Sequence, residues 1–314
     1  MFWSKLTKPF FVLAPMADVT DTAFRRIIAK YGKPDVTWTE FVSADGLCSP
    51  GREILLHDLK YTEAERPIVS QLFTAHPEKM EQAAALAERL GFDGVDINMG
   101  CPDRSIEKQG AGAALIKTPA QAKEVIRAAK RGTNLPVSVK TRVGYNKVEL
   151  EEWLPALLEE DIAALTVHAR TRKEMSAVPA RWEHVKRAVE IRDAMGKSTL
   201  IIGNGDAVSL ADARQKVAET GADGVMLGRA IFGNPWLFSE RIPSLEEKLR
   251  VMVEHTKLFE ELLGGVKSFS IMKKHYKAYV NGFDGAKELR TELMEAKDAE
   301  EVSKITELFL SRQS

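Results

Sequence analysis

The stretch Gly94-Val95-Asp96-Ile97-Asn98-Met99-Gly100-Cys101-Pro102 carries the strongest structural signal in this chain. Apolar residues recur at every second position up to Met99, which predicts a buried strand that ends at a Gly-Cys-Pro corner. Gly100 permits unusual backbone angles and Pro102 fixes its own φ, so the corner displays the thiol of Cys101. A lone cysteine is more often a small buried residue than a reactive one. The rest of the chain has to decide between these two roles.

Strand-like runs recur along the chain with helical patterns between them. We predict strands at 11–14, 36–41, 68–73, 94–99, 137–141, 165–168, 200–203 and 224–227. We predict helices at 21–31, 78–90, 119–131, 149–160, 180–194 and 209–220. Strands this apolar need cover on both faces, and alternation with helices makes them parallel. The sequence therefore predicts an α/β fold, a (β/α)8 TIM barrel. The irregular connection 43–67 is expected to hold an active-site loop with short helices.

From Pro243 onward the pattern contains helices only, at 245–263, 269–280, 286–296 and 299–310. We therefore predict two domains, a barrel at 1–242 and a small α-helical domain at 243–314. No acidic residue lies between positions 262 and 283. Four lysines cluster there, namely Lys267, Lys273, Lys274 and Lys277. Such a run is either a solvated helix face or a surface that meets phosphates.

Composition excludes several classes of protein. The 314 residues contain 45 Lys and Arg against 45 Asp and Glu, so any affinity for nucleic acid must come from local patches. Two cysteines, Cys48 and Cys101, do not make a disulfide scaffold and favour a reduced, cytoplasmic setting. No run approaches the roughly 18 apolar residues of a membrane helix. We expect a soluble monomer with no membrane segment and no metal site.

Polar residues stand at the end of each predicted strand, where barrels of this type build their active sites. They are Pro15-Met16-Ala17-Asp18, Glu40, Gln71, Asn98 with Cys101, Lys140 and Arg142, His168 and Arg170, Asn204-Gly205-Asp206, and Gly228-Arg229. Lys140 lies in an apolar run, where a cation is costly to bury without an anionic partner. A structural salt bridge is the alternative for this one lysine. Packing alone does not account for all eight ends, so we predict an active-site ring.

Glycines after the last two strands point to a phosphate. Ile202-Gly203-Asn204-Gly205-Asp206 and the segment ending in Gly228-Arg229 each open onto a predicted helix. Backbone N–H groups at such places bind phosphate, and Arg229 adds charge-assisted hydrogen bonds. Tight turns are the alternative explanation. Combined with Lys140 and the amide of Gln71, the set suits FMN, with Gln71 at an edge of the isoalloxazine and Lys140 near N1 and O2.

The ordered set of motifs resembles the tRNA-dihydrouridine synthase (Dus) family across the whole barrel. The matching segments are Ala14-Pro15-Met16-Ala17-Asp18-Val19-Thr20-Asp21, Gln71-Leu72-Phe73, Asp96-Ile97-Asn98-Met99-Gly100-Cys101-Pro102, Gly110-Ala111-Gly112-Ala113-Ala114-Leu115, Val139-Lys140-Thr141-Arg142, Val167-His168-Ala169-Arg170-Thr171-Arg172, Gly203-Asn204-Gly205-Asp206 and Met226-Leu227-Gly228-Arg229. Two departures stand out. Asp103-Arg104-Ser105-Ile106 follows Pro102 where the family often has Lys-Val, and Ala169 stands where the family usually has Gly.

The resemblance implies an FMN-dependent catalytic barrel and a helical tRNA-binding domain. NADPH would reduce the flavin, which would then reduce the C5–C6 double bond of a uridine in tRNA, in the D-loop region. The implied FMN contacts are Pro15, Met16, Ala17, Gln71, Lys140, His168, Asn204, Gly205, Asp206, Gly228 and Arg229. The implied proton donor is Cys101, which protonates C5 after hydride from N5 reaches C6. Candidate contacts to tRNA are Asn98, Arg142, Arg170, Arg172, Lys267, Lys273, Lys274 and Lys277.

Three other functions stay open at this point. The same barrel could serve a small-molecule FMN-dependent ene reductase or dihydroorotate-type oxidoreductase, although the basic tail argues against that. Lys140 could be the nucleophile of a Schiff-base aldolase. The chain could also bind tRNA without catalysis. If the Dus resemblance holds, Cys101 must act as a protonated thiol, and the loop 103–112 becomes the expected gate over the substrate.

Overall fold

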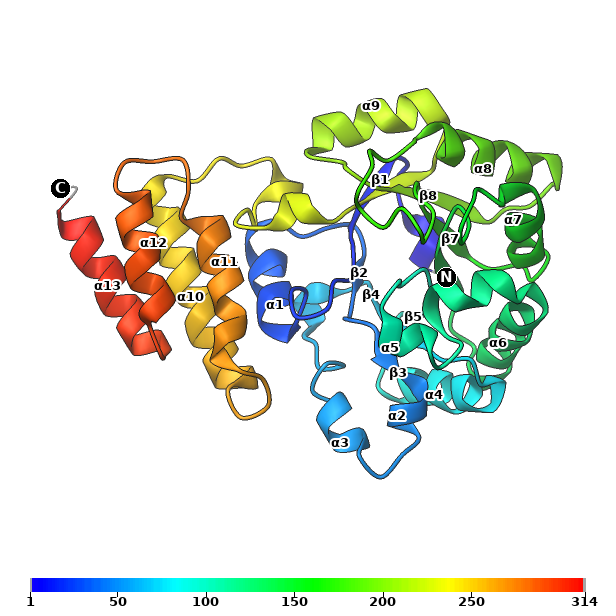
Figure 1. Cartoon of the computed structure of the whole chain (residues 1–314), viewed down its shortest axis with the longest axis horizontal. Helices are drawn as coiled ribbons and strands as arrows, with labels where there is room; N and C mark the ends of the chain where they lie inside the picture. The colour runs from blue at the N-terminus through cyan, green and yellow to red at the C-terminus, as the bar shows by residue number, and fades with distance from the viewer. Residues whose placement is uncertain (1, 313–314) are drawn as a thin grey trace.

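The computed structural model describes residues 2–312, and in it parallel strands form a barrel surrounded by helices (Figure 1). The strands are β1 (Phe10–Leu13), β2 (Thr37–Trp38), β3 (Val42–Ser43), β4 (Ile68–Phe73), β5 (Gly94–Met99), β6 (Val137–Arg142), β7 (Ala164–His168), β8 (Leu200–Asn204) and β9 (Gly224–Leu227). Their order is β1-β9-β8-β7-β6-β5-β4-β2, with β3 also paired to β4. The seam between β1 and β2 is bridged by Asp35, whose N–H donates to the Phe11 carbonyl at 3.0 Å and whose carboxylate accepts from the Phe11 N–H at 2.7 Å. The predicted (β/α)8 barrel is confirmed.

The outer helices follow the predicted pattern closely. They are α1 (Thr22–Tyr31), α4 (Pro77–Arg89), α6 (Pro119–Gly132), α7 (Leu150–Leu158), α8 (Glu183–Ala194) and α9 (Leu210–Thr220). Side-chain caps begin α1 and α9, where Asp21 accepts from the Phe24 N–H and Ser209 from the Asp212 N–H, whereas α4 and α6 begin with a proline. Gly221 ends α9 in the left-handed conformation. The outward-facing side chains of the strands are apolar because these helices cover the outside.

The predicted strand 36–41 was wrong in its extent. The Thr39 hydroxyl accepts the Gln71 N–H at 3.1 Å and donates to the Glu40 carbonyl at 2.8 Å, so the ladder is interrupted between β2 and β3. The connection that follows holds α2 (Ala44–Leu47), α3 (Arg52–Leu55) and η2 (Glu63–Glu65), as expected for 43–67. A short helix α5 (Arg104–Glu107) and a 3-10 helix η3 (Gly112–Lys117) follow β5.

The helix predicted to open after 224–227 was also wrong. The chain forms only two 3-10 turns there, η4 (Arg229–Ile231) and η5 (Leu237–Ser239). Gly233 has φ +67°, and a Cβ at this position would lie 2.1 Å from the Ala278 carbonyl oxygen. The left-handed backbone of Gly233 cannot belong to a right-handed helix, and Pro235 lacks the N–H that such a helix would use. The chain therefore passes directly from the barrel to the C-terminal helices.

The C-terminal part consists of α10 (Leu245–Leu263), η6 (Phe269–Ile271), α11 (Met272–Tyr279), α12 (Ala286–Glu295) and α13 (Ala299–Ser311). These helices form a bundle beside α1 (Figure 1). One cluster of buried side chains runs from α1 and β9 into this bundle, with the Phe24 ring stacked on His255 at 4.7 Å. The division at residue 242 stays a prediction, since the two parts share a core. Within residues 2–312 no helix has both the length and the apolar character needed to cross a membrane.

A buried ion pair fastens the irregular connection to the first helix. Arg25 of α1 and Glu65 of η2 meet at 2.9 Å, and neither side chain is exposed. Arg25 also donates to the backbone carbonyls of Thr20 at 2.8 Å and Lys60 at 2.6 Å. Glu65 accepts the Thr62 N–H at 2.7 Å. The guanidinium nitrogens of Arg25 and both carboxylate oxygens of Glu65 therefore have hydrogen-bond partners inside the protein.

We expect Glu65→Gln to destabilise the protein by about 3 kcal/mol, because it leaves a buried guanidinium without a counter-charge. Urea unfolding followed by circular dichroism measures this loss. Glu151→Gln is the matched control, since Glu151 pairs with Arg187 at 2.8 Å on the surface. That exposed pair is worth at most about 1 kcal/mol. Equal losses in the two variants would contradict a special role for the buried pair.

Candidate active site at the carboxyl ends of the strands

A cavity of about 700 Å³ opens at the carboxyl ends of the strands. Cofactor sites have volumes of about 300–1,000 Å³. All of the predicted cofactor residues line it except Ala17 and Gln71. The lining residues are Ala14, Pro15, Met16, Lys140, His168, Arg170, Ser176, Asn204, Gly205, Asp206, Ala207, Val208, Gly228, Arg229 and Ala230. The structure thus brings together side chains from strands that lie far apart in the sequence.

Lys140 projects from β6 into this cavity without a carboxylate partner. Within residues 2–312 no ion pair of 4.0 Å or less reaches its amine. Burial and then the nearby charge of Arg142 lower the pKa of Lys140 to about 8, while Asp96 acts in the opposite direction. The structural salt bridge considered from the sequence is therefore not formed. A partly buried cation that faces a cavity fits an anionic ligand group, such as the N1–O2 edge of a reduced flavin.

Asp206 organises the cationic side of the cavity. Its carboxylate accepts from the guanidinium groups of Arg170 and Arg229 and from the Ala180 N–H at 2.8 Å. Burial opposes ionisation, but these donors hold the pKa of Asp206 below its usual value. Arg170 is almost fully buried and also donates to the Val178 carbonyl at 2.6 Å. Arg170 therefore lies inside the site and is not placed to reach a tRNA phosphate on the surface.

His168 is held as a neutral imidazole. Burial, followed by the charges of Arg142 and Lys140, lowers its pKa well below the usual range. Arg170 Nη1 lies 3.2 Å from His168 Nε2. Because a guanidinium has donors only, Nε2 must accept and the proton must sit on Nδ1. His168 can therefore donate a hydrogen bond from Nδ1 without adding charge to the cavity.

The glycine segments leave room and charge for a phosphate. Gly205 has φ +129°, and a Cβ there would lie 2.7 Å from the Ala180 Cβ. Arg229, two-thirds exposed, stands at the rim next to Gly228. With Lys140, Arg170 and Arg229 facing the cavity and Asp206 as the carboxylate among the lining residues, the lining is cationic overall. These residues fit a flavin mononucleotide, whose phosphate and ring edge are both anionic.

A chain of buried hydrogen bonds runs from the barrel interior to the backbone of Cys101. Asp96 accepts from Ser138 Oγ at 2.5 Å and from Gln71 Nε2 at 2.7 Å. Asn98 Nδ2 donates to Gln71 Oε1 at 3.1 Å, and Asn98 Oδ1 accepts the Cys101 N–H at 2.9 Å. Gln71 and Asn98 are thus partly engaged within the protein and support the Gly-Cys-Pro corner.

Asp96 is a member of this network to which the sequence analysis assigned no role. Burial raises the pKa of its carboxyl to about 6, although the hydrogen bonds from Ser138 and Gln71 and the charge of Lys140 oppose this. The signal was available, because a carboxylate inside an apolar strand is as unusual as Lys140. In the β5–β6 pair, Asn98 stands beside Lys140 and Asp96 beside Ser138.

Cys101 is displayed as a protonated thiol. Burial raises its pKa, and the charge of Asp103 works in the same direction. The Cys101 carbonyl accepts the Ala113 N–H at 2.9 Å. Gly112 has φ +60°, and a Cβ there would lie 2.8 Å from that carbonyl, so only glycine lets the loop pack so closely. The side chain contacts the small apolar cluster of Phe73, Ile106 and Ala111.

The predicted tRNA contacts Arg142 and Arg172 are both occupied. Arg142 is buried, and its Nε donates to the Gly100 carbonyl at 2.8 Å, so it supports the corner from beneath. Arg172 Nε binds both carboxylate oxygens of Glu107, at 2.8 and 3.0 Å, and its guanidinium lies 5.4 Å from the Tyr145 ring. Glu107 belongs to α5, inside the expected gate 103–112. Glu107 was not among the residues predicted from the sequence, because only its ion pair with Arg172, 65 positions further along the chain, shows that it holds α5 in place.

The four lysines of the tail separate into two environments. Lys267 is mostly buried and pairs with Glu40 at 2.8 Å and with Asp58 at 3.0 Å. Lys277 is exposed, and Lys273 and Lys274 are half-buried on α11. Among the described residues, no ion pair of 4.0 Å or less reaches the amines of Lys273, Lys274 or Lys277. Lys267 is already neutralised by carboxylates of the barrel.

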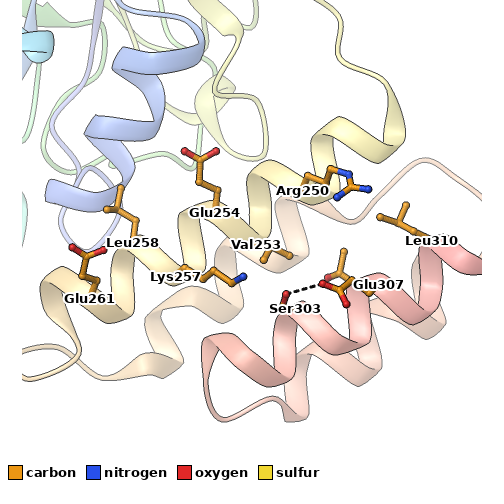
Figure 2. A pocket seen from close by; sticks show the side chains of 10 residues that line it. Arg250, Val253, Glu254, Lys257, Leu258, Glu261, Ser303, Glu307 and Leu310 are labelled. Carbon is orange, nitrogen blue, oxygen red and sulfur yellow. Dashed lines mark hydrogen bonds between the residues drawn. The ribbon is translucent and has the colours of Figure 1, made fainter.

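A second hollow lies away from the strand ends, between α10 and α13 (Figure 2). Its volume is about 400 Å³, and acidic Glu254, Glu261 and Glu307 line it together with Arg250 and Lys257. Glu254 is engaged by Lys30 at 2.7 Å and by the Tyr31 hydroxyl at 2.6 Å. No predicted site residue reaches this hollow, so the strand-end cavity is the candidate active site.

Comparisons with known proteins agree with this geometry. Among solved structures, morphinone reductase superposes with a TM-score of 0.52 at 15% identity, covering 76% of this chain and 87% of that one. Histamine dehydrogenase from Rhizobium superposes with a TM-score of 0.54 at 13% identity, covering 79% and 48%. At such identities the likeness concerns the fold alone. It agrees with the (β/α)8 barrel fold described above.

The sequence comparisons are more specific. The family described as "Dihydrouridine synthase (Dus)" matches residues 12–313. "Probable tRNA-dihydrouridine synthase 2" of Bacillus subtilis is 42% identical over 98% of this chain and 96% of that protein. A "Probable tRNA-dihydrouridine synthase" of Staphylococcus aureus is 39% identical over 98% and 95%. The chain belongs to the dihydrouridine synthase family and is an oxidoreductase.

We expect Glu107→Ala and Arg172→Ala to expose the Cys101 thiol, because each breaks the ion pair that ties α5 over it. In a Cys48→Ser background, the rate of alkylation of Cys101 by iodoacetamide should rise several-fold at neutral pH. The double variant should behave like either single one, since both remove the same interaction. Arg187→Ala, which breaks an exposed pair on α8, is the control. Unchanged alkylation in both single variants would rule out this tie.

Proposed function

We propose that the protein reduces the C5–C6 double bond of uridines in tRNA to give dihydrouridine, with FMN as bound cofactor and NADPH as reductant. The observation that carries this proposal is Lys140 in the strand-end cavity, a cation that forms no ion pair with a carboxylate in the described part of the chain. It lies on the strand next to the one that leads to Cys101. Family membership supports the flavin and the uridine substrate. The cationic lining of Arg170 and Arg229 supports a cofactor that carries a phosphate.

The chemistry divides between the cofactor and the protein. When bound, a reduced flavin supplies a hydride to C6 of the uracil ring. Cys101 supplies the proton that completes the reduction at C5, so that one hydride and one proton saturate the double bond. The raised pKa of Cys101 keeps the proton on sulfur until the carbanion-like centre forms. The positive charges of Lys140 and Arg142 stabilise the thiolate that is left behind. The thiolate then takes up a proton from water.

The protein must also receive a nucleotide that is stacked within tRNA. The target base has to be flipped out to reach the strand ends. Lys273, Lys274 and Lys277 on α11 supply the phosphate contacts, because their amines are not consumed as that of Lys267 is. The D-loop region is the part of tRNA that the resemblance implies. We further propose that the enzyme works as a monomer in the cytoplasm.

A lysine of lowered pKa would also suit a Schiff-base mechanism, but that reaction needs no neighbouring acid thiol and no phosphate site. A small-molecule ene reductase would use the same cavity without α11. Neither alternative has an observation in its favour that the tRNA proposal lacks. The helical bundle, with its row of lysines, favours a polyanionic substrate.

We expect the purified protein to be yellow and to lose its flavin absorbance when NADPH is added. Lys140→Met should weaken FMN binding about tenfold or more, because a hydrogen bond to a charged group contributes about 1.5–3 kcal/mol. Fluorescence titration of the apoprotein measures this affinity. Lys123→Met is the control, since Lys123 pairs with Glu159 on the outer surface of α6. A colourless protein that cannot be reconstituted with FMN would refute the proposal.

We expect Cys101→Ala to keep FMN and tRNA binding while dihydrouridine formation falls by about 10²–10⁴, the usual worth of a general acid. The rate of the unchanged enzyme should fall as alkaline pH removes the thiol proton, because only the protonated form can donate. Single-turnover assays with unmodified tRNA measure the chemical step. Cys48→Ala serves as the matched thiol control. A Cys101→Ala rate equal to that of the unchanged enzyme would remove Cys101 from the mechanism.

A further inference from the structure

We propose that Lys267 is a positioning residue that couples the C-terminal helices to the loop after β1, which lines the cofactor cavity. The inference rests on the function proposed above for that cavity. Lys267 lies in the turn between α10 and η6, yet its amine contacts carboxylates of the barrel. Glu40 lies at 2.8 Å, Asp58 at 3.0 Å and Asp18 at 3.7 Å.

The three carboxylates come from three different segments of the barrel. Glu40 follows β2, Asp58 lies between α3 and η2, and Asp18 follows β1. The side chains of Lys267 and Glu40 are only 13% and 6% exposed. Although burial acts in the other direction, Glu40 and Asp58 raise the pKa of Lys267 above its usual value, so it stays charged. Without this amine, the three carboxylates would repel one another at a partly buried site.

Glu40 transmits the contact to the cofactor loop. One of its carboxylate oxygens binds Lys267, and the other accepts the backbone N–H of Asp18 at 2.5 Å. Asp18 has φ +55°, in the left-handed region that residues with a side chain rarely adopt. An acceptor on its N–H helps to hold this strained conformation. Asp18 therefore depends on Glu40, and Glu40 depends on Lys267.

The strained residue closes a tight turn whose first part faces the cavity. The Met16 carbonyl accepts the N–H groups of Val19 at 3.1 Å and Thr20 at 3.0 Å. The Met16 N–H donates to the Thr20 hydroxyl at 2.9 Å. Pro15 and Met16 line the cavity. A change at Asp18 must therefore shift residues that contact the cofactor.

The consequence is a coupling between tRNA binding and FMN binding. Lys273, Lys274 and Lys277 follow Lys267 by a few residues, on the helix proposed to bind tRNA. A displacement of that helix would change the contact between Lys267 and Glu40, and through Glu40 the position of the loop after β1. The sequence analysis treated Lys267 as a phosphate contact like the other three. The structure assigns it a positioning role instead. A phosphate contact would affect the protein only when tRNA is bound, whereas a positioning residue affects the loop after β1 and FMN binding without tRNA.

The test compares Lys267→Met with two matched variants in the absence of tRNA. Lys277→Met removes an exposed lysine from the same region. Lys30→Met removes another ion pair between the barrel and the tail, Lys30 with Glu254 at 2.7 Å, which does not touch the loop after β1. Hydrogen exchange of the peptide covering residues 15–20 reports on the loop directly. FMN titration by fluorescence reports on the cavity.

We expect Lys267→Met to speed hydrogen exchange in residues 15–20 several-fold and to weaken FMN binding about tenfold, within the usual range for coupled sites. Lys277→Met and Lys30→Met should change neither quantity. Lys267→Arg, which keeps the charge, should restore most of the protection. If Lys267→Met fails to fold, Lys267→Gln replaces it.

Unchanged exchange in residues 15–20 for both Lys267→Met and Lys267→Gln would overturn the coupling. So would equal loosening by Lys30→Met, because the effect would then be general separation of the two parts. The exchange readout needs no flavin. If the unchanged protein failed to bind FMN, the proposed function would fall while exchange would still decide the role of Lys267.

Discussion

The barrel encloses a cation, Lys140, that has no carboxylate partner within residues 2–312, and the surrounding site is arranged around that constraint. An unpaired charge in such a place is unfavourable, so its pKa falls and its environment is poised to receive an anion. Burial, and then the charges of the neighbouring Arg142 and Lys140, likewise lower the pKa of His168 and keep its imidazole neutral. Asp206 is the one carboxylate among the lining residues, and both of its guanidinium partners face the cavity. The free protein is thus prepared for a bound anion.

Two hydrogen-bond networks connect the strand ends to segments around the cavity. One runs through Asp96, Gln71 and Asn98 on β4 and β5 to the backbone of Cys101, and β5 pairs with β6, the strand that carries Lys140. The other runs from Lys267 through Glu40 to Asp18, in the same turn as Pro15 and Met16, which line the cavity. Both networks join segments that are distant in sequence.

The C-terminal helices are more than an appended binding module. Their buried side chains continue the cluster that contains Phe24 and Ile27 of α1, and His255 stacks on Phe24. Removing the tail would expose this core and disturb the barrel, so deletion would not separate substrate binding from catalysis. Point changes on the exposed side of α11 leave the shared core intact. A substitution of exposed Lys277 therefore tests tRNA binding without disturbing the barrel, which a truncation cannot do.

The sequence by itself determined the class of fold, the order of the strands and the residues at their carboxyl ends. These follow from local periodicity and from the geometry of parallel barrels, which brings all strand ends to one face. It did not determine which polar residues face the cavity and which are consumed by one another. Arg142, Arg170, Arg172 and Lys267 look alike as basic residues near a predicted site. Only the tertiary structure shows that Arg142 binds the Gly100 carbonyl and that carboxylates bind the other three, because no local pattern specifies where Asp206, Glu107, Glu40 and Asp58 lie relative to them. The same holds for the break in the strand 36–41, where a hydroxyl of Thr39 competes with the ladder.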